Sequence, residues 1–160
     1  MTILKIFIST IIAINCLSVK AMEPMEPWER VNMTEEEFIL LSSITEAESN
    51  RSQTDNEGRI MIAICILNRV NDETGRFGEG ITGVISQSGQ FSTCLRASDG
   101  TYYSVTERTE LSDQAVIEAV RRIESGEAPA VLWFNCIGYS YGTPYGNIGG
   151  NYFSCDGGIR

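Results

Sequence analysis

The sequence predicts an α+β fold that is mainly helical, with a small antiparallel sheet late in the chain. Three observations indicate this fold. Segments with helical patterning dominate the sequence before residue 127, strand-like runs come only after it, and no internal repeat or low-complexity tract interrupts the pattern. A chain of 160 residues is long enough to bury a core as one domain.

The first helix is predicted over residues 34–48. Thr34 and Glu37 have the spacing of a capping box, in which the hydroxyl accepts from a free backbone N–H and the glutamate reaches back. Further along, the apolar residues recur with helical spacing and share one arc: Leu40, Leu41, Ile44 and Ala47. This segment is therefore expected to be an amphipathic helix.

A second helix is predicted over residues 57–70, with Asp55 or Asn56 as its cap. Its apolar residues lie on every side, which predicts that it is surrounded by protein at the centre of the domain. The remaining elements expected are a short helix over 81–86, a third long helix opening at Ser112-Asp113 and closed by Gly126, and strands over 131–136 and 151–155.

The start of the chain is typical of an export signal. Lys5 supplies a positive charge, a mostly apolar run follows, and small residues around Ala21 suit a signal peptidase. We therefore expect residues 1–21 to be a signal peptide, 22–33 a leader, and 34–160 the folded domain. The apolar run is shorter than the about 20 residues of a membrane span, so we expect a secreted or periplasmic protein without stable membrane insertion.

The charge of the chain is strongly negative. It has 21 acidic and 12 basic residues, a net charge of −9, and no histidine. Both lysines, Lys5 and Lys20, lie within the first 21 residues, so removal of that segment changes the net charge to −11. Such a surface argues against nucleic acid and anionic lipid as partners. We expect a monomer.

Four cysteines remain after residue 21, and an oxidising compartment makes disulfides plausible among them. Three full pairings exist for Cys65, Cys94, Cys136 and Cys155. Cys65 lies in an apolar helical run and is expected to be a buried free thiol, whereas Cys136 and Cys155 flank a glycine-rich turn and are the first choice for a bridge. With no CxxC pair and no histidine, no metal site is expected.

The lack of histidine restricts the possible chemistry. Ser-His-Asp catalytic triads and Cys-His catalytic dyads are excluded, and no glycine-rich phosphate-binding motif is present. Proton transfer must then use carboxylates, tyrosine or a thiol. Glycoside cleavage is the large reaction class that uses carboxylates alone, so an exported enzyme without a cofactor points to a polysaccharide substrate.

Two glutamates stand near the end of the first predicted helix, in SSITEAESNRSQ (42–53). Glu46 lies away from the apolar arc, whereas Glu48 falls on that arc if the helix extends so far. Three interpretations stay open: Glu46 as a catalytic acid, Glu48 in that role, or a solvated helix end without catalysis.

Five motifs follow one another in an order that resembles the SleB-type cell wall hydrolases, which include spore cortex-lytic enzymes. They are TEAESN (45–50), IAICILNRV (62–70), VISQSGQFS (84–92), VLWFN (131–135) and IGGNYF (148–153). Each motif is weak alone, but together they extend the resemblance over residues 36–155. The resemblance implies a lysozyme-like enzyme that acts on peptidoglycan glycan strands, as a lytic transglycosylase at the bond between N-acetylmuramic acid and N-acetylglucosamine.

Glu46 stands at the position of the family's catalytic glutamate. The resemblance implies that an apolar setting keeps it protonated, so that it donates to the leaving oxygen and then accepts the proton of the muramic C6 hydroxyl. The resemblance, together with the aromatic character of the chain, indicates these substrate-binding residues: Gln90, Phe91, Tyr102, Tyr103, Trp133, Asn151 and Tyr152. Asn68 and Arg69 are expected to tie a helix end through hydrogen bonds.

Two departures from the family pattern keep alternatives open. The family commonly has arginine where Glu48 stands, and usually histidine where Asn151 stands, unless Tyr152 takes that place. One alternative is a hydrolase in which Asp55 or Glu57 positions water. The other is a secreted wall-binding module that has lost turnover.

Overall fold

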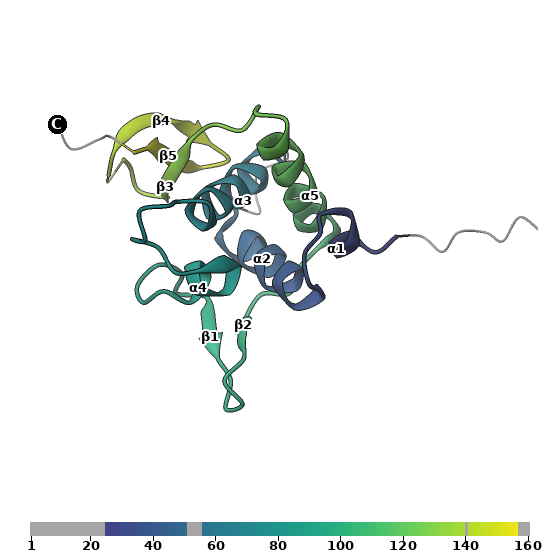
Figure 1. The fold of residues 1–160 in the computed structure, drawn as a ribbon. Coiled ribbons are helices and arrows are strands. Elements are labelled where there is room, and N and C mark those ends of the chain that lie inside the picture. Colours follow the sequence, from purple (N-terminus) through teal and green to yellow (C-terminus); the bar gives the residue numbers. More distant parts are fainter. Residues whose placement is uncertain (1–24, 51–55, 140, 157–160) are drawn as a thin grey trace, which may run out of the picture.

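The computed structural model describes residues 25–50, 56–139 and 141–156, and it confirms the α+β fold (Figure 1). Within these residues the helices are α1 (Pro27–Arg30), α2 (Glu35–Glu48), α3 (Glu57–Val70), α4 (Gly80–Ser86) and α5 (Glu110–Glu124). The strands are β1 (Cys94–Arg96), β2 (Tyr102–Ser104), β3 (Val131–Asn135), β4 (Thr143–Ile148) and β5 (Asn151–Cys155). The proposed signal peptide, residues 1–21, lies outside the described residues.

The strands form two antiparallel sheets. Strands β1 and β2 make a hairpin, and the later sheet has the order β3-β5-β4. In Figure 1 the hairpin projects from the helices on the side away from the later sheet. No helix in the described ranges is long and apolar enough to cross a membrane.

Helix α2 begins as predicted. Thr34 Oγ1 accepts from the backbone N–H of Glu37 at 3.2 Å, and the Glu37 carboxylate accepts from the backbone N–H of Thr34 at 3.3 Å. The reciprocal bonds satisfy donors that a helix start leaves without partners. Phe38, Leu41 and Ile44 are fully buried, so the helix packs its apolar arc into the core.

Helix α3 occupies the centre of the domain, also as predicted. Its residues from Gly58 to Leu67 are all buried, and α2, α4, α5 and the sheet pack around it (Figure 1). Asn56, one of the two predicted caps, is the N-cap residue of this helix, but its side chain makes no capping hydrogen bond. Asn56 has helical backbone angles, and its amide donates instead to the Leu111 carbonyl oxygen at 2.9 Å. The other candidate cap, Asp55, lies outside the described residues.

Helix α5 starts at Glu110, earlier than the predicted Ser112-Asp113. Thr109 is its N-cap and accepts from the backbone N–H of Ser112 at 3.2 Å, so the serine belongs to the first turn rather than preceding it. Gly126 follows the helix with a φ of 74°, a left-handed conformation that glycine adopts without strain.

Four elements were not expected: helix α1, the hairpin strands β1 and β2, and strand β4. Helix α1 has 4 residues and each hairpin strand has 3, lengths over which neither helical nor alternating periodicity can be recognised. Strand β4 contains Pro144 and Gly146, two poor strand formers, and exists because it pairs with β5. Long-range pairing, not local pattern, therefore decides these strands.

The expected bridge between Cys136 and Cys155 is not formed, and all four described cysteines are free. Cys155 pairs with Val131 at the start of β3, whereas Cys136 follows the last residue of that strand. Five residues of strand separate the two positions by roughly 16 Å, far beyond the about 7 Å Cα separation that a disulfide tolerates. Cys65 is a fully buried thiol, as expected, and burial raises its pKa to about 12.

Candidate active site

Three helix ends meet around Glu46 near the C-terminal end of α2. Its side chain is only 3% exposed. Arg59, at the start of α3, donates from Nε to Oε2 at 2.8 Å and from Nη2 to Oε1 at 3.1 Å. Thr109, which caps α5, donates its hydroxyl to Oε2 at 3.0 Å. We call Glu46, Arg59 and Thr109 the Glu46 junction.

The contacts of the Glu46 junction favour the ionised carboxylate. A guanidinium that holds both oxygens, with a hydroxyl donor beside it, stabilises negative charge on the carboxylate. The implied apolar setting for a protonated Glu46 is therefore not what the structure shows. The Glu46 carboxylate is buried, but it forms an ion pair with Arg59.

A contact between glycines joins the Glu46 junction to the later sheet. A Cβ placed on Gly58 would lie 2.9 Å from the Cα of Gly149, which forms the β4–β5 turn with a φ of 58°. A Cβ on the adjacent Gly150 would lie 2.9 Å from Asn50 Nδ2. The turn thus packs directly against the end of α2 and the start of α3.

A polar groove of about 510 Å³ lies between the end of α2 and the later sheet, and we call it the Glu48 groove. It is lined by Ala47, Glu48, Arg69, Gly89, Gln90, Trp133, Phe134, Asn135, Cys136, Ile137, Tyr141 and Asn151. The Glu48 carboxyl is half-buried, and burial raises its pKa above the usual 4.5. Thr93 donates to Oε1 at 3.0 Å, which opposes that rise.

Three of the predicted substrate-binding residues, Gln90, Trp133 and Asn151, line the Glu48 groove. Asn151 is buried, and its Nδ2 donates to the Glu48 carbonyl oxygen at 3.4 Å, which ties β5 to the end of α2. Trp133 contacts the ring of Tyr141, another lining residue, at a tilt of 42° with the ring centroids 5.3 Å apart. The groove therefore combines an aromatic wall with amide and carboxyl groups.

Two other predicted residues, Phe91 and Tyr152, do not line the Glu48 groove. Phe91 is 6% exposed and packs on Phe134, so its side chain belongs to the core. Tyr152 makes an edge-to-face contact with Tyr139, with ring centroids 5.1 Å apart. Its side chain belongs to the sheet surface rather than to the groove lining.

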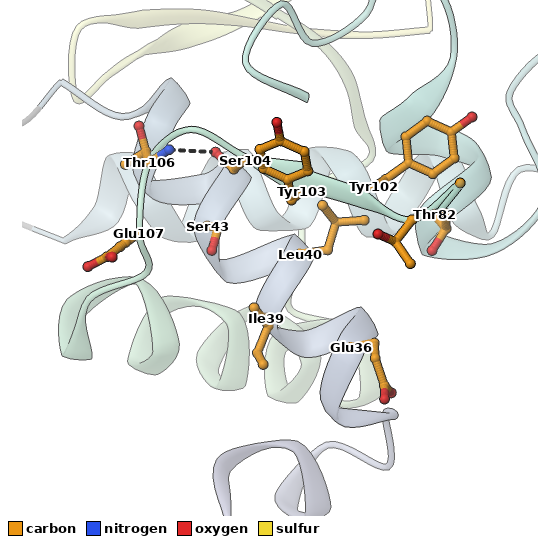
Figure 2. A pocket seen from close by; sticks show the side chains of 12 residues that line it. Glu36, Ile39, Leu40, Ser43, Thr82, Tyr102, Tyr103, Ser104, Thr106 and Glu107 are labelled. Carbon is orange, nitrogen blue, oxygen red and sulfur yellow. Dashed lines mark hydrogen bonds between the residues drawn. The ribbon is translucent and has the colours of Figure 1, made fainter. Parts of the chain in front are cut away.

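The predicted pair Tyr102 and Tyr103 lines a separate cavity of about 610 Å³ between α2 and β2, shown in Figure 2. We call it the Tyr103 cavity. Its lining is mostly apolar and includes Ile39 and Leu40 of α2 (Figure 2). Glu46 lines neither this cavity nor the Glu48 groove. The tyrosines therefore lie apart from the other predicted substrate-binding residues.

The side chain of Arg69 was expected only to tie a helix end, but it also lines the Glu48 groove. Its Nε donates to the Leu132 carbonyl oxygen at 2.7 Å, and its Nη1 donates to Gln90 Oε1 at 2.9 Å. Asn68 behaves as expected, since its amide bonds the carbonyl oxygens of Pro129 and Val131. The LNRV motif was the available signal for Arg69, but its contact with Gln90 was not foreseen.

Other chemistry is poorly supported around this site. Glu57, one candidate for positioning water, accepts from Arg122 at 2.5 and 2.9 Å, and Asp55 lies outside the described residues. Within the described ranges, no three His, Cys, Asp or Glu side chains cluster so as to hold a metal ion.

Comparison with known families gives one match. A family model described as cell wall hydrolase matches residues 53–140, more than half of the chain. The chain belongs to this cell wall hydrolase family, which confirms the SleB-type resemblance. No curated protein and no solved structure matches the chain.

Family membership implies a hydrolase that acts on peptidoglycan, and therefore action on the cell wall, outside the cytoplasm. The matched range contains Arg69, Gln90 and Trp133 of the Glu48 groove. It begins after Glu46 and Glu48, so the match itself assigns no role to either glutamate.

Proposed function

We propose that this protein cleaves the glycosidic bond between N-acetylmuramic acid and N-acetylglucosamine in peptidoglycan, as a lytic transglycosylase with Glu46 as its single catalytic glutamate. The observation that carries the proposal is the placement of this glutamate at the end of α2, where the following residues Ala47 and Glu48 line a groove with an aromatic wall. The family match supports the substrate class. The protein acts as a monomer, secreted or periplasmic, without a cofactor.

The Glu48 groove has the properties of a sugar-binding site. Its volume, about 510 Å³, lies in the usual range for ligand pockets. Trp133 and Tyr141 offer aromatic faces for a pyranose ring, and Gln90 offers an amide for hydrogen bonding. This mixture of flat apolar surface and few polar groups suits the face of a sugar ring and its polar substituents.

Arg59 and Thr109 hold the Glu46 carboxylate in one position, so its protonation requires a change in the Glu46 junction. Arg59 holds the carboxylate form, which is the form that accepts the C6 hydroxyl proton in the second half of the reaction. Donation in the first half requires that the contact with Arg59 loosens when the glycan binds.

Glu48 is a second candidate for the proton donor. Its carboxyl lines the groove, and burial raises its pKa, which favours the protonated form that an acid needs. A single glutamate is enough for a transglycosylase, because the C6 hydroxyl replaces water as the nucleophile. Hydrolysis with Glu57 as the second carboxylate is less favoured, since Arg122 already holds both of its oxygens.

Mass analysis of released muropeptides tests the proposal. The wild-type protein should release fragments with 1,6-anhydromuramic ends, and Glu46→Gln should lower the rate by about 100- to 10,000-fold, the usual contribution of a general acid–base group. Glu35→Gln, an exposed change at the start of the same helix, is the matched control and should keep full activity. New reducing ends in the products would instead identify a hydrolase.

Folding must be controlled in this experiment, because Glu46→Gln leaves the Arg59 guanidinium without its ionised partner. The double variant Glu46→Gln/Arg59→Gln removes both charges, so it should fold better than the single variant and stay inactive. Full activity in the double variant would exclude Glu46. Loss of activity in Glu48→Gln alone would assign the proton to Glu48, and binding without any release would identify a wall-binding module.

A further inference from the structure

The buried guanidinium of Arg69 has an unusual environment. Its residue is 4% exposed, and no ion pair with a carboxylate is found for it among residues 25–50, 56–139 and 141–156. It lies 5.3 to 6.0 Å from the ring centroids of Phe77, Phe91, Trp133 and Phe134. The aromatic faces and the Leu132 carbonyl oxygen compensate the charge and hold the guanidinium in one place.

The fixed guanidinium determines how the Gln90 amide is turned. Arginine can only donate hydrogen bonds, so the Gln90 atom that faces Arg69 Nη1 at 2.9 Å must be the carbonyl Oε1. The amide nitrogen, Nε2, is consequently directed away from this contact. Within the described part of the chain, Nε2 makes no hydrogen bond, and its two N–H groups are left for an occupant of the groove.

We propose that Arg69 and Gln90 together make this wall of the Glu48 groove a fixed hydrogen-bond donor that selects N-acetylated sugars through their acetamide carbonyl oxygen. Gln90 is the binding residue and Arg69 is the positioning residue. The proposal builds on the proposed function for its polymer, but the selection concerns binding and does not depend on which glutamate transfers the proton.

The position of Trp133 supports the same inference. The Arg69 guanidinium lies 5.4 Å from the Trp133 ring centroid, so one cation holds both the aromatic wall and the amide donor of the groove. The edge of a pyranose ring that stacks on Trp133 then lies near the Gln90 amide N–H groups, whose direction is fixed. A sugar with a hydroxyl in place of the acetamide has no carbonyl oxygen for that donor, and its shorter hydroxyl does not reach the same position, which costs affinity.

Isothermal titration calorimetry with two neutral tetrasaccharides tests the selection. One is the β-1,4-linked tetramer of N-acetylglucosamine and the other is the corresponding glucose tetramer, which lacks only the acetamides. The wild-type protein should bind the N-acetylated tetramer about tenfold tighter or more, the effect of one unmatched polar group. Equal affinities, or no measurable binding of the N-acetylated tetramer, would overturn the proposal.

Two variants separate the roles of Gln90 and Arg69. Gln90→Glu keeps an oxygen facing Arg69, so the fold is preserved, but it replaces the donor N–H groups with an acceptor. It should lose the preference for the N-acetylated tetramer while glucose-tetramer affinity changes little. Arg69→Lys should also reduce the preference for the N-acetylated tetramer, since the ammonium group of lysine does not reproduce the planar arrangement of N–H donors in the guanidinium.

If Gln90→Glu does not change the ratio of the affinities for the two tetramers, the role of Gln90 is overturned. If Arg69→Lys does not change this ratio, the role of Arg69 is overturned. A defect of packing alone would weaken both tetramers equally and would not change the ratio. Muropeptide release reports on the proposed function separately. Release without sugar preference contradicts only the selection, and preference without release contradicts only the cleavage.

Discussion

The two glutamates that end α2 experience opposite environments although only Ala47 separates them. Glu46 lies in a dry junction of three helix ends, with Arg59 on both of its oxygens. Glu48 lines an open groove, with a single hydroxyl donor from Thr93. The direction in which each side chain leaves the helix, and not its chemistry, produces this difference.

The comparison shows that one helix end can present one carboxylate fixed by an ion pair and one carboxyl whose pKa is raised by burial. In the Glu46 junction, charge is neutralised by a partner and the geometry is locked. In the Glu48 groove, partial burial raises the pKa of the Glu48 carboxyl. Three further changes, from the largest expected effect to the smallest, test this contrast.

Removing the cation of the Glu46 junction should have the largest effect. Arg59→Ala removes the guanidinium that binds both oxygens of a buried carboxylate, so the free energy of unfolding should fall by about 3–5 kcal/mol. Urea denaturation followed by circular dichroism measures the change. A loss below about 1 kcal/mol, the value of exposed pairs, would mean that the junction is solvated and that its contrast with the groove is absent.

The glycine contact that joins the junction to the sheet should give an intermediate effect. Gly58→Ala places a methyl group against the Gly149 backbone, which is expected to cost about 1–3 kcal/mol of overpacking strain. Gly138→Ala is the matched control, because a Cβ there meets nothing within 4 Å. Equal melting temperatures for the two variants would contradict the close approach.

The smallest effect is expected at Glu48 and appears as a pH dependence. Because burial raises its pKa in the folded protein, the folded state holds this proton more tightly than the unfolded chain. Its contribution to stability is therefore greatest at low pH and is lost as pH rises from 4.5 through the raised pKa. Glu48→Gln should remove this loss, a gain at neutral pH that solvent screening keeps below about 1 kcal/mol.

Thermal denaturation at several pH values measures the Glu48 effect, and Thr93→Val sharpens it. The Thr93 hydroxyl lowers the pKa of Glu48, so its removal should raise that pKa further and extend the loss of stability to higher pH. A difference between Glu48→Gln and wild type that does not grow with pH would show that the carboxyl is solvated like an ordinary surface group.

Much of the fold was predictable from local patterns. The capping box of Thr34 and Glu37 defined the start of α2, and the all-round apolar character of α3 identified the central helix. Gln90, Trp133 and Asn151, which were predicted from the sequence as substrate-binding residues, line one groove in the structure. The family relation was visible in the order of short motifs, which the family match confirms.

Contacts between distant residues were not predictable in this way. Glu46 receives hydrogen bonds from residues 13 and 63 positions away, and no local pattern indicates that Arg59 and Thr109 would meet it. The contact of Arg69 with Gln90 crosses 21 positions. The separation of Cys136 from Cys155 likewise follows from the register of β3 with β5, which spacing along the chain does not reveal.

The sequence by itself determined where the long helices form and which chemistry is available, because caps, periodicity and the absence of histidine are local or compositional properties. Only the tertiary structure decided that Glu46 is paired, that Glu48 lines the groove and that Gln90 is turned by a buried cation. These states depend on which side chains packing brings within hydrogen-bond distance, and that distance is a property of the folded chain alone.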